Sequence, residues 1–84
     1  MHASEHLIIN RKAEILKRIG ISKSTLHVKI KQRLLPPAIP LGARSVGFLK
    51  HEIDAVLAAM VAGRSNQQIQ SLVAELVAQR QLAA

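Results

Sequence analysis

The side chains that could do chemistry gather on one face of a short segment of this chain, residues 23–34. When the segment is wound as a helix, with about 100° between successive residues, Ser24, Val28 and Lys31 fall together on one side. The side chains that flank this face are also polar or basic: Thr25, His27, Lys29 and Gln32. Hydroxyl and amide groups can hydrogen-bond base edges, a small apolar group can contact a thymine methyl, and ammonium groups can neutralise phosphates. The pattern therefore favours a helix that enters the major groove of duplex DNA.

The opposite side of the same helix is apolar. Leu26, Ile30 and Leu34 fall together, so we expect them to face the core. The segment contains no acidic residue, although an exposed helix normally mixes acids with bases. His27 has two interpretations at this point. It could donate a hydrogen bond to a base or a phosphate, with a charge that changes near about pH 6.5, or it could pack partly buried beside Ile30.

A second amphipathic helix is predicted directly before this one, over residues 11–19. A brief strand over residues 7–9 precedes it, and Asn10 is a good N-cap. Gly20 can adopt the left-handed conformation that ends a helix, and Ser22 can cap the next one. Two helices joined by about three residues that include a glycine form the helix-turn-helix pattern.

A hairpin is predicted after the second helix. Residues 35–41 cannot be helical, because three prolines remove hydrogen-bond donors and impose extended backbone. Residues 41–48 then fit a tight hairpin, with Val46 and Phe48 pointing inward and Arg44 near the tip. Beside a recognition helix, such a hairpin is a wing whose arginine reaches phosphates or an adjacent minor groove. The alternative is a surface arginine on an ordinary β-turn.

Two further helices are predicted, over residues 50–62 and from residue 66 to about residue 81. Gly63 separates them, and Ser65 and Gln68 form a capping box at the start of the last helix. We expect a DNA-binding domain over residues 1–62 and a C-terminal helix within residues 63–84. That helix either packs on the domain, which so small a core favours, or mediates oligomerisation.

The composition limits the chain to a small basic module. It has 84 residues, no cysteine, a single aromatic residue and a net charge of +7. Residues 11–50 hold ten basic side chains against one acidic side chain, a net charge of +9, which indicates contact with a polyanion. A basic surface that serves only solubility is the other interpretation. The lack of cysteine, of a long apolar run and of a signal-like N-terminus favours a cytoplasmic location without membrane contact.

Several linked blocks of the sequence follow one another at a fixed spacing. They are residues 20–26, Pro36, residues 41–49 and residues 52–54. Together, without a gap from about Leu7 to Ala62, they resemble the AlpA family of prophage and genomic-island regulators. These regulators have a MerR-like winged-helix fold and are related to phage excisionases. The resemblance thus implies a mainly helical winged helix-turn-helix fold with a small β-hairpin wing, followed here by a C-terminal helical extension.

The resemblance implies sequence-specific binding of double-stranded DNA in the bacterial cytoplasm, at the nucleoid, in one of two roles. One is a recombination directionality factor (excisionase), which bends attachment-site DNA so that a tyrosine-type integrase excises its element. The other is a transcriptional regulator of a mobile-element promoter, such as that of the integrase gene. Because one module this small buries only about 600–1,000 Å² on DNA, several copies are expected to bind side by side.

Position by position, the resemblance assigns the base-reading turn and the wing arginine to particular residues. The matching positions are Lys23, Ser24, Thr25, Val28 and Arg44. Four positions depart from the family pattern: His27 replaces a Tyr, Arg33 a helix-ending Gly, Leu35 a Phe and Phe48 a Trp. Since His27 and Arg33 change the DNA-facing surface, the preferred DNA sequence is expected to differ from that of relatives.

Other chemistry has weaker support. His2, Glu5 and His6 could share a helical face as zinc ligands, but a clear fourth ligand is lacking, so we expect no metal and no cofactor. Without paired carboxylates on one face or a glycine-rich phosphate loop, we expect no enzymatic activity. A single Phe cannot supply the stacking platform on which single-stranded RNA recognition depends. A protein adaptor would explain the last helix but not the basic charge.

Overall fold

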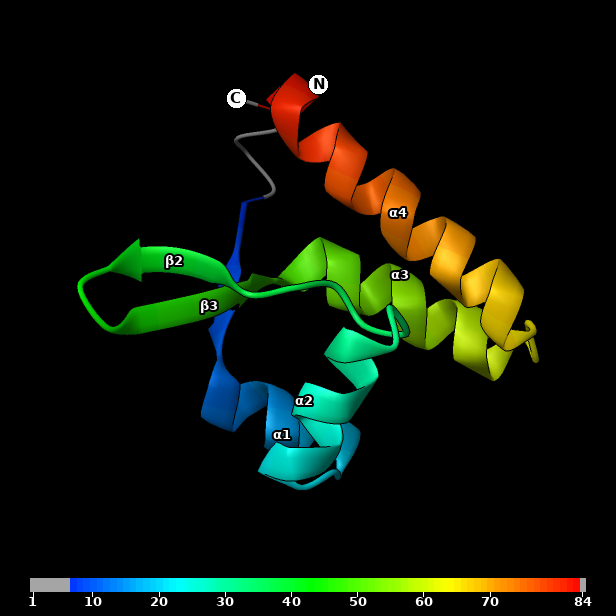
Figure 1. The fold of residues 1–84 in the computed structure, drawn as a ribbon, viewed down its shortest axis with the longest axis horizontal. Coiled ribbons are helices and arrows are strands. Elements are labelled where there is room, and N and C mark those ends of the chain that lie inside the picture. The colour runs from blue at the N-terminus through cyan, green and yellow to red at the C-terminus, as the bar shows by residue number, and fades with distance from the viewer. Residues whose placement is uncertain (1–6, 84) are drawn as a thin grey trace.

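A computed structural model describes residues 7–83 of the chain, which form a small antiparallel sheet and four helices (Figure 1). The strands are β1 (Ile9–Arg11), β2 (Ile39–Gly42) and β3 (Ser45–Leu49), in the spatial order β1-β3-β2. The central strand contains Gly47 because its neighbours approach closely. A Cβ there would lie 2.4 Å from Cγ2 of Ile9.

Four helices lie within the described residues, with bounds close to the expected ones. They are α1 (Lys12–Ile19), α2 (Lys23–Lys31), α3 (Lys50–Val61) and α4 (Asn66–Ala83). Figure 1 shows α1 and α2 at one end of the molecule, the β2–β3 hairpin projecting to one side, and α4 crossing above α3. This arrangement confirms the predicted fold, which is mainly helical with a small hairpin wing.

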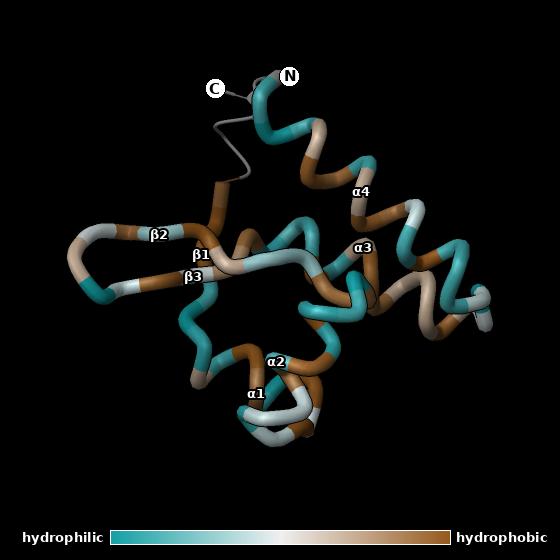
Figure 2. The backbone as a smooth tube through the Cα atoms, viewed as in Figure 1, coloured by the Kyte–Doolittle hydropathy of each residue, from teal (hydrophilic) through white to brown (hydrophobic). Residues whose placement is uncertain are grey.

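One apolar core joins the four helices and the central strand. Its largest side chain is Phe48, which is 1% exposed, and α1, α2, α3 and α4 each contribute to it. The other buried members are Ile15, Leu26, Leu35, Ile53, Val56, Ile69, Val73 and Leu76. Figure 2 shows apolar stretches recurring along α3 and α4. Three of the core residues belong to α4, so the last helix packs against the rest of the fold within one chain.

The predicted caps of α1, α2 and α4 have mixed outcomes. Ser22 caps α2, since its Oγ accepts a hydrogen bond from the Thr25 backbone N–H, and Gly20 ends α1 at φ +76°. Ser65 and Gln68 form the expected capping box, with reciprocal hydrogen bonds of 2.9 and 3.2 Å. Asn10 as the N-cap of α1 was wrong, because this residue pairs with Phe48 inside β1. Arg11 takes the N-cap position instead.

The predicted end of α2 was also wrong. The helix stops at Lys31 rather than at Leu34, and Arg33 turns the chain with φ +63°. The Leu34 N–H donates to the Lys29 carbonyl at 2.9 Å, which closes the turn as a Schellman motif. This early turn lets Leu35, which is 2% exposed, enter the core just before a proline that disfavours helical backbone at the preceding residue.

A buried ion pair fastens α4 to the domain. The Arg80 guanidinium donates to both carboxylate oxygens of Glu52, at 2.8 and 2.6 Å, and to the Pro37 carbonyl at 2.9 Å. Glu52 is fully buried, and it is the only buried charged residue in the described part of the chain. The predicted helix over residues 50–62 placed Glu52 near its start, and in the structure Glu52 lies in the first turn of α3, where a carboxylate complements the helix dipole. Its partner stands 28 residues further along the chain.

Candidate nucleic-acid interface

The residues predicted to read DNA lie on the outer face of α2. Opposite them, Leu26 is fully buried and holds the helix against the core. Val28 is 51% exposed, and His27 is exposed rather than packed beside Ile30. The remaining exposed members of the predicted set are Lys23, Ser24, Lys31 and Gln32. The helix thus presents a polar and basic surface with one small apolar side chain in its middle.

Hydroxyl groups at the start of α2 form a local network. Ser22 Oγ donates to Thr25 Oγ1 at 2.9 Å and lies 3.2 Å from Ser24 Oγ. Thr25 is half-buried, unlike the other members of the predicted set. The cap therefore orients the Thr25 hydroxyl and places Ser24 at the exposed N-terminal turn of the helix, where a recognition helix contacts base edges.

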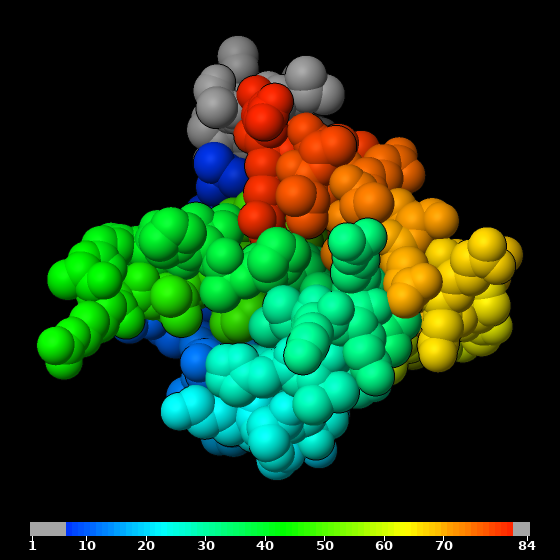
Figure 3. All heavy atoms as spheres, viewed as in Figure 1, coloured from blue at the N-terminus to red at the C-terminus, as the bar shows by residue number. Residues whose placement is uncertain are grey.

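Arg44 lies in the turn between β2 and β3, as predicted, because Gly42 pairs with Ser45 on either side of it. Its side chain is exposed. In the space-filling view of Figure 3, the hairpin extends well beyond the body of the molecule. The structure therefore does not bring Arg44 into the α2 cluster. It presents two separate projections, a helix and a wing, which suits simultaneous contacts in a groove and on the neighbouring backbone.

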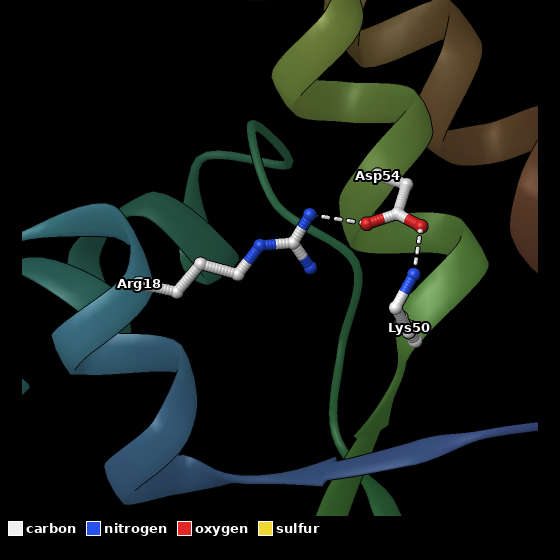
Figure 4. Close-up of polar contacts among 3 residues, drawn as sticks. All are labelled: Arg18, Lys50 and Asp54. Atoms are coloured by element: carbon white, nitrogen blue, oxygen red, sulfur yellow. Dashed lines mark hydrogen bonds and ion pairs between the residues drawn. The ribbon is translucent and has the colours of Figure 1, made fainter.

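Asp54 partly neutralises two of the basic side chains. Its carboxylate accepts a hydrogen bond from Lys50 Nζ at 2.8 Å and pairs with the Arg18 guanidinium (Figure 4). The hydrogen bond from Lys50, and to a lesser extent that from Arg18, holds the pKa of Asp54 below its ordinary value of 3.8. This contact joins α1 to α3. Local sequence patterns could not predict this contact, because Arg18 and Asp54 stand 36 residues apart.

The lysine side chains of α2 are not neutralised by ion pairs within the described residues. Within residues 7–83, the ion pairs involve Arg18, Lys50 and Arg80 but none of the α2 lysines. No carboxylate of this part of the chain therefore competes with a polyanion for Lys23, Lys29 or Lys31. A positive surface of this kind steers phosphates toward it and contributes affinity that salt weakens.

In the described part of the chain, no group of three or more His, Cys, Asp or Glu side chains comes together, so this part contains no candidate metal site. His2, Glu5 and His6, the residues considered as zinc ligands, lie outside that part. Among residues 7–83, every helix falls short of the length and apolar character needed to cross a bilayer.

Comparison with known proteins assigns this chain to a family. Residues 8–59 match the family model described as "Prophage CP4-57 regulatory protein (AlpA)". A protein of Enterobacteria phage P4, "Uncharacterized protein ORF88", is 35% identical over 54 residues, which are 64% of this chain and 61% of that protein. No solved structure matches the chain. Because the family model spans more than half of its residues, α2 and the wing included, this chain belongs to the AlpA family of prophage regulatory proteins.

Proposed function

We propose that this chain, as its family implies, is a phage-related regulator that binds double-stranded DNA in a sequence-specific manner. The observation that carries the proposal is the outer face of α2, which combines base-reading side chains with lysines that no carboxylate of residues 7–83 neutralises. Hydroxyl, imidazole and amide groups offer hydrogen bonds to base edges, and Val28 offers an apolar contact to a thymine methyl.

The side chains divide into two roles. One set would contact base edges: Ser24, Thr25, His27, Val28 and Gln32. A second set would contact the sugar-phosphate backbone of the DNA. That second set is Lys23, Lys31 and Arg44. The wing arginine would contact phosphates or enter the adjacent minor groove, where the potential favours a guanidinium. No catalytic step and no cofactor belong to this proposal, and the place of action is the bacterial nucleoid in the cytoplasm.

The proposed role is that of a recombination directionality factor. Several copies would bind side by side on attachment-site DNA and bend it, so that a tyrosine-type integrase excises a prophage or genomic island. Small winged modules bind weakly alone, because each buries only about 600–1,000 Å². Adjacent copies would add their contacts along one stretch of DNA.

Transcriptional regulation is the second candidate. The matching family is named for a prophage regulatory protein, which favours control of a mobile-element promoter such as that of the integrase gene. The two roles use the same DNA-binding surface and differ in where the sites lie.

An excision assay separates the two roles. In a strain that carries the integrated element, this gene is deleted and the integrase is expressed from an unrelated inducible promoter. We expect excision junctions to be lost and to return with the wild-type chain, but not with Arg44→Ala. Arg64→Ala removes the same charge from an exposed residue outside the wing and α2, and serves as the matched control. Excision restored by the integrase alone would contradict the directionality role and leave transcription.

A further inference from the structure

An open groove separates the end of α2 from α4. It has a volume of about 840 Å³, and its floor includes the core residues Leu35 and Val73. Its polar lining consists of Lys31, Gln32, Arg33, Gln67, Gln70 and Ser71. In Figure 3, the end of α2 and the segment that follows it lie beside α4 on one face of the molecule. This lining has two cations, four neutral polar side chains and no acidic residue. Such a lining suits an anion.

The groove is continuous with the proposed DNA-reading surface. Lys31, the last residue of α2, and Gln32, its C-cap, belong to both, since they are exposed and line the groove. A direct hydrogen bond fixes the two walls, because Gln70 Nε2 donates to the Gln32 carbonyl at 2.8 Å. DNA seated against α2 would therefore bring its backbone toward α4.

The backbone conformation of Arg33 is a second observation, independent of the lining of the groove. In this chain α1, α2 and α3 are each followed by a residue with positive φ: Gly20 (+76°), Arg33 (+63°) and Gly63 (+77°). Glycine adopts this conformation freely, whereas a residue with a Cβ is strained there. The Arg33 side chain is exposed and makes no hydrogen bond or ion pair within residues 7–83. Glycine would make the same turn without strain, and the Arg33 side chain forms no hydrogen bond or ion pair in the described part of the chain that would offset the strain, which points to a role outside the fold.

We propose that this groove holds the sugar-phosphate backbone of the bound DNA, so that α4 is part of the DNA interface. Arg33 and Lys31 pair with phosphates, while Gln67 and Ser71 donate neutral hydrogen bonds to the same strand. The inference rests on the proposed DNA binding and extends its surface beyond α2 and the wing.

The first test replaces Arg33 with glycine in the full chain. Arg33→Gly relieves the backbone strain, so we expect the Tm to rise by a few degrees while DNA affinity falls. Removal of one phosphate contact lowers the slope of log K against log salt by about 0.9, which corresponds to roughly tenfold weaker binding at 0.1 M salt. A merely structural role would raise the Tm and leave affinity and salt slope unchanged.

The second test places a negative charge in the groove. Gln67→Glu lies in the first turn of α4, where a carboxylate complements the helix dipole, so the fold is not weakened. Gln79→Glu makes the same change at an exposed position of α4 outside the groove and is the matched control. We expect Gln67→Glu to weaken duplex binding several-fold more than Gln79→Glu at low salt, with the difference fading as salt rises.

Both tests measure binding to a duplex of the site that the wild-type chain occupies. Wild-type affinity and salt slope in both Arg33→Gly and Gln67→Glu would overturn the groove proposal alone, because wild-type binding shows that the DNA-binding proposal stands. A wild-type chain that does not distinguish this duplex from unrelated DNA would overturn the proposed function itself, and the groove proposal with it.

Discussion

At the scale of single residues, Glu52 shows what local sequence could not predict. Its position in the first turn of α3 was evident, but its complete burial against Arg80 was not. Sequence periodicity assigns residues to faces of one helix and says nothing about which charged residue of a distant helix meets them. The same holds for Asp54, whose partner Arg18 lies on α1.

Arg80→Ala should destabilise the fold strongly. It leaves the Glu52 carboxylate fully buried without a counter-charge, a loss of about 3–5 kcal/mol for a pair of this kind. Urea denaturation followed by circular dichroism measures the loss. The double variant Glu52→Gln with Arg80→Met removes both charges and should recover a large part of it. A single variant within about 0.5 kcal/mol of wild type would contradict the role assigned to this pair.

The lowered pKa of Asp54 predicts that the stability of the fold depends on pH. Because its pKa is lowered in the folded chain, its contribution is present above the unfolded pKa, which is close to 3.8, and is lost as pH falls through the folded value. Since the side chain is 38% exposed, that contribution is at most about 1 kcal/mol. Asp54→Asn should be less stable than wild type at pH 7 and equal to it in strong acid. A constant difference in Tm from pH 7 to pH 2 would contradict this account.

At the scale of elements, local signals were sufficient wherever a side chain acts on its own backbone. Ser22, Gly20 and the capping box of α4 mark helix ends through hydrogen bonds within a few residues, and all three were predicted. The end of α2 was missed because a non-glycine residue, Arg33, takes the left-handed position. Asn10 was misassigned because pairing with β3, which is distant in sequence, drew it into the sheet.

The two elements proposed to contact DNA should respond differently to substitution. Arg44→Ala removes a backbone contact, so it should weaken binding to all sequences alike and lower the salt slope by about 0.9. Ser24→Ala and Val28→Ala should instead change the preferred base at individual positions, by about 1–3 kcal/mol each. Binding selections with randomised duplexes, analysed beside salt titrations, measure both quantities. An unchanged preference in both α2 variants would contradict the recognition role of this helix.

At the scale of the whole molecule, charge is divided along the chain, whereas the core draws on both parts. The basic segment, residues 11–50, forms α1, α2 and the wing, whereas the nearly neutral remainder supplies α3 and α4. The composition predicted this division of charge, and the resemblance predicted the winged helix-turn-helix fold. Neither predicted how α4 closes the core or that its polar side chains line a groove beside α2.

The central claim is that this chain recognises particular DNA sites of a mobile element. A map of genome-wide occupancy, made with the tagged wild-type chain and with Ser24→Ala and Val28→Ala combined, tests it most directly. We expect the wild type to occupy discrete sites at the junctions of an integrated element, and the double variant to lose them. Occupancy spread evenly over the genome, unchanged in the double variant, would contradict the claim and leave the basic surface as a non-specific one.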